Sequence, residues 1–283
     1  MVNHRGAAAA PIVAATVAAL IFIAPSPARA QLYEQIGIRA QGMAGAFVAV
    51  ADDATATWWN PAGLATGAYV NGIVEHSGAE DNGAVGVSVA YPALGVSYYR
   101  FHLRSLVLNQ FGATVGQSLG EHLVVGSTVK IVRGERTRGD LDVGASATFG
   151  SARVAVAARH IGAPDIGTDQ HPVELERQVR AGAAYTSTLG GGAMVTSAID
   201  ADLTKTTTSN GDARHVAAGV ELWPTPRVGV RGGVSANTTG DLRAAASVGA
   251  SVAVRSGVFV DGFVTRGDDE AKKGWGFALR ATF

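Results

Sequence analysis

Hydrophobic and polar side chains alternate with a period of two along most of the chain beyond residue 66. Between Leu242 and Arg255, even-numbered positions hold Leu, Ala or Val, and odd-numbered positions hold Arg, Ser, Gly or Ala. Successive side chains of a β-strand point to opposite faces, so the pattern predicts strands with one apolar face and one small or polar face. The same alternation recurs in residues 141–149, 178–186, 193–203, 215–223 and 275–283.

Such runs number about fourteen, and most are close to the 9–11 residues that a tilted strand needs to cross a bilayer. Their connections are alternately short, as at residues 92–93 and 150–151, and longer and more polar, as at residues 77–83, 162–175 and 205–212. A membrane barrel with tight turns at one end predicts this asymmetry, whereas a soluble sandwich does not. The predicted fold class is all-β, a transmembrane antiparallel β-barrel of about 14 strands over residues 67–283. The runs lie near residues 68–76, 84–91, 94–103, 106–117, 122–133, 140–149, 152–161, 176–188, 193–204, 213–223, 226–235, 241–254, 257–266 and 273–283.

The less apolar face is rich in Gly, Ala, Ser and Thr, which suits the inside of a narrow barrel better than the wet face of a sandwich. Aromatic residues make up 7% of the chain, which is low for two complete rings of interface aromatics and is the feature that favours the sandwich. Basic side chains spaced along this face are expected to point into the lumen and to pair with carboxylates there, or alternatively to select anions. These candidate lumen charges are Lys130, Arg153, Arg159, Arg180, Arg231, Arg243 and Arg280.

The first thirty residues have the order of a secretory signal peptide. The basic pair His4-Arg5 precedes an apolar run over residues 6–24, and Ala28-Arg29-Ala30 has the small residues of a cleavage site. We expect export with cleavage after Ala30, and insertion of the barrel into the outer membrane of a Gram-negative bacterium. The alternative is an N-terminal anchor, but an Ala-rich run broken by Pro11 is a poor membrane span.

Residues 31–66 do not alternate. Nearly all positions over residues 40–51 are small or apolar, which is compatible with a short buried helix, and Asn60-Pro61 favours an extended or turn conformation. The segment is too apolar for water, so we expect it to lie in the lumen as an N-terminal plug, with Asp52 and Asp53 meeting inward arginines. The candidate plug and gating residues are Gly42, Gly45, Asp52, Asp53, Trp58, Trp59, Asn60, Pro61, Ala62 and Gly63.

Within this segment, residues 39–64 read RAQGMAGAFVAVADDATATWWNPAGL. This run resembles the N-terminal signature of the FadL-type family of outer-membrane barrels and of its shorter PorV/PorQ-like relatives. Residues 171–185 and 219–233 also resemble strand motifs of that family. The resemblance implies a fourteen-stranded barrel closed by its N-terminal segment. In the transporter branch, hydrophobic molecules such as long-chain fatty acids enter from outside, the plug shifts, and the cargo leaves sideways into the membrane.

Even the longer connections of this chain are polar and short beside the long apolar external loops of the fatty-acid transporters, which this chain lacks. The alternative is therefore a docking or structural barrel, since some of the shorter relatives serve protein secretion. The C-terminal run resembles the signal read by the barrel-assembly machinery, through Trp275, Phe277, Leu279 and Phe283. The expected partners are outer-membrane lipid, that machinery during biogenesis, a hydrophobic small-molecule cargo and, on the docking alternative, another envelope protein.

The composition of the chain excludes several other classes of protein. Twenty-three basic and 23 acidic residues balance, without the basic footprint of a nucleic-acid binder. The chain has no Cys, which excludes disulfides, thiolate metal sites and Cys nucleophiles. The string at residues 116–120 has the Gly-x-Ser-x-Gly form of a hydrolase nucleophile, but strands flank it and we expect a turn. Asp268-Asp269-Glu270 is expected to be a solvated loop, with a divalent cation as the alternative. We expect no catalytic residue, no cofactor and no resident metal.

Overall fold

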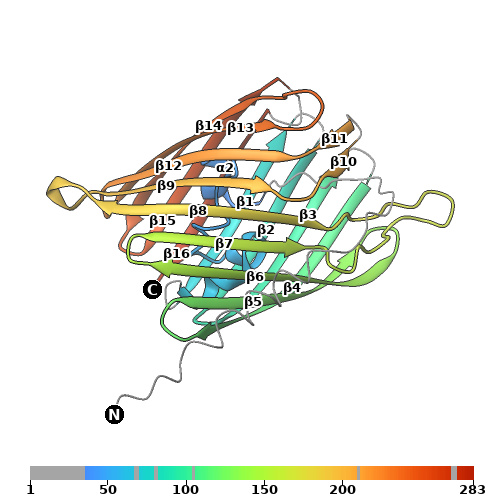
Figure 1. Cartoon of the computed structure of the whole chain (residues 1–283), viewed down its shortest axis with the longest axis horizontal. Coiled ribbons are helices and arrows are strands. Elements are labelled where there is room, and N and C mark those ends of the chain that lie inside the picture. Colours follow the sequence, from blue (N-terminus) through green and yellow to red (C-terminus); the bar gives the residue numbers. More distant parts are fainter. Residues whose placement is uncertain (1–35, 67–69, 80–81, 104–105, 209–210, 269–272) are drawn as a thin grey trace, which may run out of the picture.

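The computed structural model describes residues 36–66, 70–79, 82–103, 106–208, 211–268 and 273–283. Fourteen strands of this part of the chain close into an antiparallel barrel (Figure 1). The prediction of an all-β barrel of about 14 strands is confirmed, while the predicted signal peptide and its cleavage site lie outside the described residues. None of the helices among the described residues is long and apolar enough to cross a membrane.

The barrel strands follow one another around the ring in chain order, and β1 closes the ring by pairing with both β2 and β16. Each barrel strand has two hydrogen-bonded neighbours, so the described part of the ring has no open edge. The barrel strands are β1 (Asn71–Ala79), β2 (Asn82–Tyr91), β3 (Leu94–Leu103), β4 (Leu106–Leu119), β5 (Leu123–Arg133), β6 (Thr137–Phe149), β7 (Ala152–Arg159), β8 (Gln178–Thr188), β9 (Met194–Asp202), β12 (His215–Thr225), β13 (Val228–Asn237), β14 (Ala245–Arg255), β15 (Val258–Gly267) and β16 (Gly274–Thr282).

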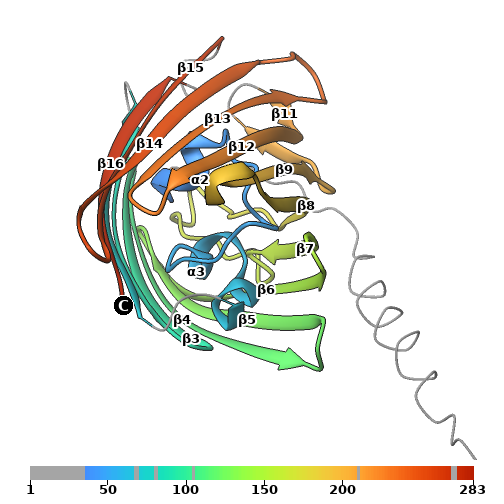
Figure 2. The ribbon, with the colours of Figure 1, turned by 90° about the vertical axis from the view of Figure 1, so that its left-hand side faces the viewer.

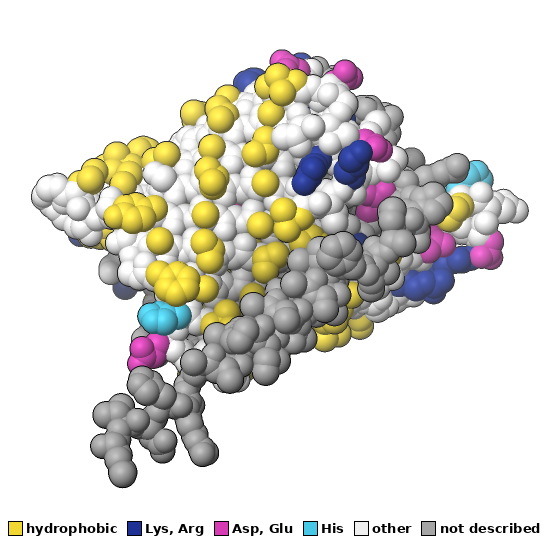
Figure 3. Space-filling view, in the orientation of Figure 1, with side chains coloured by type: hydrophobic (Ala, Val, Ile, Leu, Met, Phe, Trp, Pro, Cys, Tyr) yellow, Lys and Arg dark blue, Asp and Glu magenta, His cyan; other side chains and the backbone are white. Residues whose placement is uncertain are grey.

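The alternation in the sequence places apolar side chains outside the barrel and small or polar ones inside. On β14, Val248 and Val254 are each 64% exposed, whereas Ser247 and Ser251 are buried. Figure 3 shows the outward apolar side chains as rows across the face of the barrel, with charged side chains gathered toward its ends. A closed ring with such an outer face satisfies its backbone internally and is suited to lipid hydrocarbon.

The two ends of the barrel differ in their connections. One end has only short links, including residues 92–93, 150–151 and 256–257. The other end has the longest link, residues 160–177, which folds back far enough to bury Ile166 and Leu175. We call this end the long-loop end.

Three details differ from the sequence prediction. The link after β9 contains a small hairpin, β10 (Thr206–Thr208) and β11 (Gly211–Ala213), where only a loop is expected. β14 begins at Ala245 and not near residue 241, because Arg243 has a φ of 43° that interrupts extended backbone. The expected longer loop over residues 77–83 is a short link, because β1 and β2 stay paired as far as Ala79 and Asn82.

Residues 36–66 lie inside the ring of strands (Figure 2), and we call them the inner segment. It contains α2 (Ile38–Gly42), α3 (Ala56–Trp59) and the 3-10 helix η1 (Pro61–Thr66). The helix considered for residues 40–51 stops at Gly42, because Ala44 and Gly45 have positive φ angles of 56° and 86°. The rest of that stretch is turns and irregular backbone.

Candidate functional site

The inner segment forms the apolar centre of the lumen. Trp58 packs with ring centroids 5.3 Å from Tyr99 and 5.2 Å from Phe101, and Trp59 lies 6.0 Å from Phe47. All five rings are at most 2% exposed. Ile166 and Leu175 of the long loop belong to the same hydrophobic cluster, so the inner segment, the strands and the loop share one core.

Polar side chains of the barrel wall hold the backbone of the inner segment. Glu75 on β1 accepts hydrogen bonds from the backbone N–H groups of Gly37 and Ile38, at 2.8 and 3.2 Å. Asp200 on β9 accepts bonds of 2.8 Å from Phe47 and Val48. These carboxylates satisfy N–H groups that have no strand or helix partner.

Arg39 links the inner segment to the wall electrostatically. Its guanidinium contacts Asp52 at 2.7 Å, Asp53 at 2.9 Å and Glu221 of β12 at 2.7 Å. Burial alone would lower the pKa of Arg39, but the charges of Asp52, Glu221 and Asp53 outweigh it and raise the pKa. The two aspartates therefore meet an arginine of their own segment, not the wall arginines expected from the sequence.

The ion-pair network continues from Glu221 into the wall. Arg231 Nε lies 3.3 Å from Glu221 Oε1, and its Nη2 lies 3.7 Å from Asp261 Oδ1. Arg280 Nε contacts the other oxygen of Asp261 at 2.9 Å. Since buried charges are tolerated when each is paired and hydrogen-bonded, this chain of alternating charges stabilises a single arrangement of the segment and wall.

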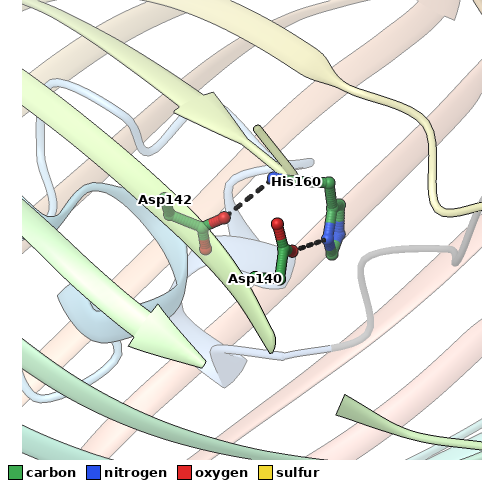
Figure 4. Close-up of side chains that lie close together, drawn as sticks. All are labelled: Asp140, Asp142 and His160. Atoms are coloured by element: carbon green, nitrogen blue, oxygen red, sulfur yellow. Dashed lines mark hydrogen bonds and ion pairs between the residues drawn. The ribbon is translucent and has the colours of Figure 1, made fainter. Parts of the chain in front are cut away.

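A second buried cluster lies near the long-loop end. Lys130 Nζ lies 2.6 Å from Asp142 Oδ1, 3.0 Å from Asp140 Oδ2 and 3.2 Å from His160 Nδ1. Figure 4 shows Asp140, Asp142 and His160 converging, with Asp140 Oδ2 2.8 Å from the imidazole. Burial and the neighbouring ammonium lower the pKa of His160, although Asp140 and Asp142 act in the opposite direction.

The spacing of these three side chains also fits a metal ion, because one ligand atom from each lies within 4.8 Å of the others. The Lys130 ammonium touches all three and supplies the positive charge that a metal would bring. We therefore interpret the cluster as a lysine-centred ion-pair site that ties β5, β6 and the start of the long loop together.

The remaining predicted lumen charges have different surroundings. Arg180 Nε forms an ion pair of 2.6 Å with Asp202, and the Arg159 guanidinium lies 4.1 Å from the Trp58 ring centroid. Arg153 donates to Thr148 Oγ1 at 3.2 Å. Arg243 lies in the link before β14, where it donates to the backbone carbonyl of Asp212 at 2.9 Å. It belongs to the long-loop end of the barrel.

Asn60 and Pro61 lie against a part of the wall where the strands lack side chains. Asn60 Nδ2 donates to the carbonyl of Val48 at 3.0 Å, and its Oδ1 accepts from the N–H of Ala62 at 3.1 Å. A Cβ at Gly126 on β5 would lie 2.6 Å from the backbone nitrogen of Ala62. The backbone of the inner segment therefore approaches the wall closely because this wall position is glycine.

Replacing Gly126 by Val is expected to destabilise the barrel by up to about 3 kcal/mol, because the new side chain meets backbone that cannot rotate away. The measurement is the thermal midpoint of the purified protein in detergent. Gly139→Val on β6 is the matched control, since a Cβ there meets nothing within 4 Å. Equal midpoints for the two variants would contradict the close contact.

The other glycines predicted in the segment are also in tight places. A Cβ at Gly42 would lie 2.6 Å from the Arg231 side chain. Gly45 has a φ of 86°, which favours glycine, and faces the His215 ring. A Cβ at Gly63 would overlap the backbone carbonyl of Ala51.

The C-terminal aromatic row faces outward. Trp275, Phe277 and Leu279 are 49–53% exposed on β16, and Phe283 is 73% exposed. The backbone of Phe283 pairs with Val70 at the start of the barrel. Recognition of this row by the assembly machinery stays a prediction.

Two further motifs have no catalytic or metal-binding geometry in the described residues. Ser118 is exposed near the end of β4, and Gly120 turns the chain with a φ of 85°, so the Gly-x-Ser-x-Gly string is a strand and tight turn. Of Asp268-Asp269-Glu270, only Asp268 lies within the described residues, and it accepts from the N–H of Ala244 at 3.1 Å.

No protein-family model matches the sequence, and no curated protein matches it. The CymD monoaromatic hydrocarbon channel aligns over 89% of this chain and 99% of its own, with a TM-score of 0.65 and 12% identity. The toluene transporter TbuX of Ralstonia pickettii aligns over 89% and 100%, with a TM-score of 0.64 and 10% identity. This chain has the fold of these proteins. A Pseudomonas aeruginosa FadL homologue agrees, with a TM-score of 0.60 and 10% identity over 87% of this chain and 98% of its own.

Four residues that join the inner segment to the wall are absent from the predicted site residues. Arg39 belongs to the run quoted for the family resemblance but is not among the candidate site residues. Glu75, Asp200 and Glu221 are inward acidic residues on predicted strands. The signal that identifies them in the sequence is a single acidic residue among the small residues on the inward face of a predicted strand.

Proposed function

We propose that this chain is a FadL-type barrel of the outer membrane that carries small hydrophobic solutes past a movable inner segment. The proposal is supported by the contacts between this segment and the barrel wall. It occupies the lumen, yet its polar contacts to the wall are made by separate side chains such as Glu75, Asp200 and Glu221. Such contacts can be exchanged without breaking any strand pairing, so the segment can shift while the barrel stays closed around it.

The charges of the lumen favour a cargo without a carboxylate. Each of four buried basic side chains already has a carboxylate partner, namely Lys130, Arg180, Arg231 and Arg280. CymD is a monoaromatic hydrocarbon channel and TbuX a toluene transporter. A small hydrocarbon is therefore our first candidate cargo, and a long-chain fatty acid the second.

A docking barrel of the PorV/PorQ-like kind is the second candidate function. The specific observation in its favour is that buried ion pairs join the inner segment to β12, through Arg39, and β5 to β6, through Lys130. On that account the inner segment would be a permanent part of the core and the rim would hold another envelope protein.

Uptake separates the two functions. Cells that express the chain are expected to take up labelled toluene several-fold faster than cells without it, with labelled fatty acid as the second substrate. A protein with Lys205→Ala, an exposed residue before β10, should match the parent. Equal uptake of both substrates with and without the chain would remove the support for transport and favour the docking barrel.

A further inference from the structure

Two arginines, one on each side of Asn109, lie on the outward face of the barrel near the long-loop end. Arg100 on β3 pairs in register with Asn109 on β4, and Asn109 pairs with Arg133 on β5. Both arginines are exposed, and the strand residues next to them in the sequence are buried. Since adjacent side chains of a strand point to opposite faces, both arginines point away from the lumen. Adjacent strands lie about 4.8 Å apart, so the two Cα atoms are about 10 Å apart and both side chains can reach one anionic group.

The next row toward the middle of the barrel is aromatic and apolar. Tyr98 and Phe111 pack with ring centroids 4.7 Å apart, and Ile131 lies beside them on β5. Phe111 and Ile131 are 53% and 54% exposed. This row has the character of a membrane surface that contacts acyl chains, with an aromatic ring at its polar boundary.

The hydroxyl of Tyr98 connects the two rows. It donates to Asn109 Oδ1 at 2.9 Å, which uses the amide oxygen and leaves the amide nitrogen of Asn109 to donate elsewhere. The Asn109 amide and the guanidinium groups of Arg100 and Arg133 therefore form a row of outward hydrogen-bond donors. This row lies next to the aromatic and apolar row, on its long-loop side.

No acidic side chain neutralises these arginines within the described residues. On the flanking strands, Val85 of β2 pairs in register with Arg100, and Thr137 of β6 pairs with Arg133. Glu135, two residues after Arg133 in the loop, is exposed and forms no ion pair with it among the described residues. In the part of the chain that the structure describes, these two positive charges at the edge of the apolar belt therefore have no acidic partner and are accessible to an external anion.

In outer-membrane barrels the longer loops face outside, so on the proposed location these residues lie at the outer leaflet. We propose that Arg100, Asn109 and Arg133 bind the phosphate groups of a phosphorylated glycolipid in that leaflet. Arginine forms bidentate hydrogen bonds to phosphate, and the acyl chains of the same lipid would lie along Phe111 and Ile131. The site is distinct from the lumen and fixes one lipid against β3, β4 and β5. The inference rests on the proposed outer-membrane location.

The test is native mass spectrometry of the detergent-purified barrel with a bis-phosphorylated lipid A, and with the same lipid after removal of its phosphates. In Arg100→Gln/Arg133→Gln, the fraction carrying phosphorylated lipid should fall at least about tenfold, as expected for the loss of two charge-assisted contacts. Arg266→Gln is the matched control, because Arg266 is an exposed outward arginine on β15. It should bind like the parent, and the dephosphorylated lipid should bind parent and double variant equally.

Equal retention of the phosphorylated lipid by the parent and the double variant would overturn this inference. So would full displacement of the lipid by the same concentration of inorganic phosphate, which would mark a free-anion site. Fractionation and uptake by the double variant keep the two proposals apart. A barrel that fractionates with the outer membrane and takes up solute, but shows equal lipid retention, refutes the lipid site alone.

Discussion

Replacing Arg39 by Ala will release the inner segment from the wall. Arg39 is the shared partner of Asp52, Asp53 and Glu221, and two of these carboxylates are buried. Breaking a buried ion pair from one side costs about 3–5 kcal/mol, because the remaining charge stays buried. We expect the segment of the purified variant to become sensitive to protease, and the variant to conduct more ions than the parent in a planar bilayer.

Two variants control this result. Arg227→Ala removes an exposed arginine from the link between β12 and β13 and should behave like the parent. Arg39→Lys keeps the charge but loses the forked geometry, so it should lie between the parent and Arg39→Ala. A closed, protease-resistant Arg39→Ala barrel would show that the apolar core alone holds the segment.

Replacing Lys130 by Ala will convert a lysine-centred cluster into a site for a divalent metal. Asp140, Asp142 and His160 keep their ligand atoms within 4.8 Å of one another, and the ammonium between them is gone. We expect the variant to be less stable than the parent without metal, since two carboxylates lose their counter-charge. Zinc at about 100 times its Kd should then restore about 2.7 kcal/mol.

The readout is the thermal midpoint of each protein with zinc and with a chelator. The parent should show no zinc effect, because Lys130 already fills the site. Lys130→Ala/His160→Ala should lose most of the gain, because it removes the nitrogen ligand. An equal rise in the midpoint of the parent would show that the metal binds elsewhere and would contradict our interpretation of the cluster.

Much of the barrel was predictable because its signals are local. The run at residues 94–103 has the same bounds as β3, since alternation is a property of neighbouring residues. The same parity places Lys130, Arg180 and Arg231 inside the barrel. The β10–β11 hairpin was missed because three-residue strands are too short to show alternation.

The contacts of the lumen were not predictable in the same way. Arg39 and Glu221 are 182 positions apart in the chain, and only the register of the whole ring brings them together. Asp52 and Asp53 were expected to pair with arginines of the wall, and that expectation was wrong. The chain turns after α2, so both aspartates lie next to Arg39 and pair with it. A single sequence contains no signal for that return.

In the proposed transport function, the inner segment must move for solute to pass. A Cβ at Gly219 on β12 would lie 2.8 Å from that of Met43 and 2.6 Å from the Met43 carbonyl oxygen, so the two backbones must separate by about 1 Å, which also gives the spacing of a disulfide. The chain has no other Cys, which leaves Met43→Cys/Gly219→Cys with one defined cross-link, and Gly219→Cys, which has the same crowding but cannot cross-link, as its control. The decisive measurement is toluene uptake by the double variant, oxidised and then reduced. We predict that oxidation stops uptake and reduction restores it, whereas equal uptake in both states would contradict the account.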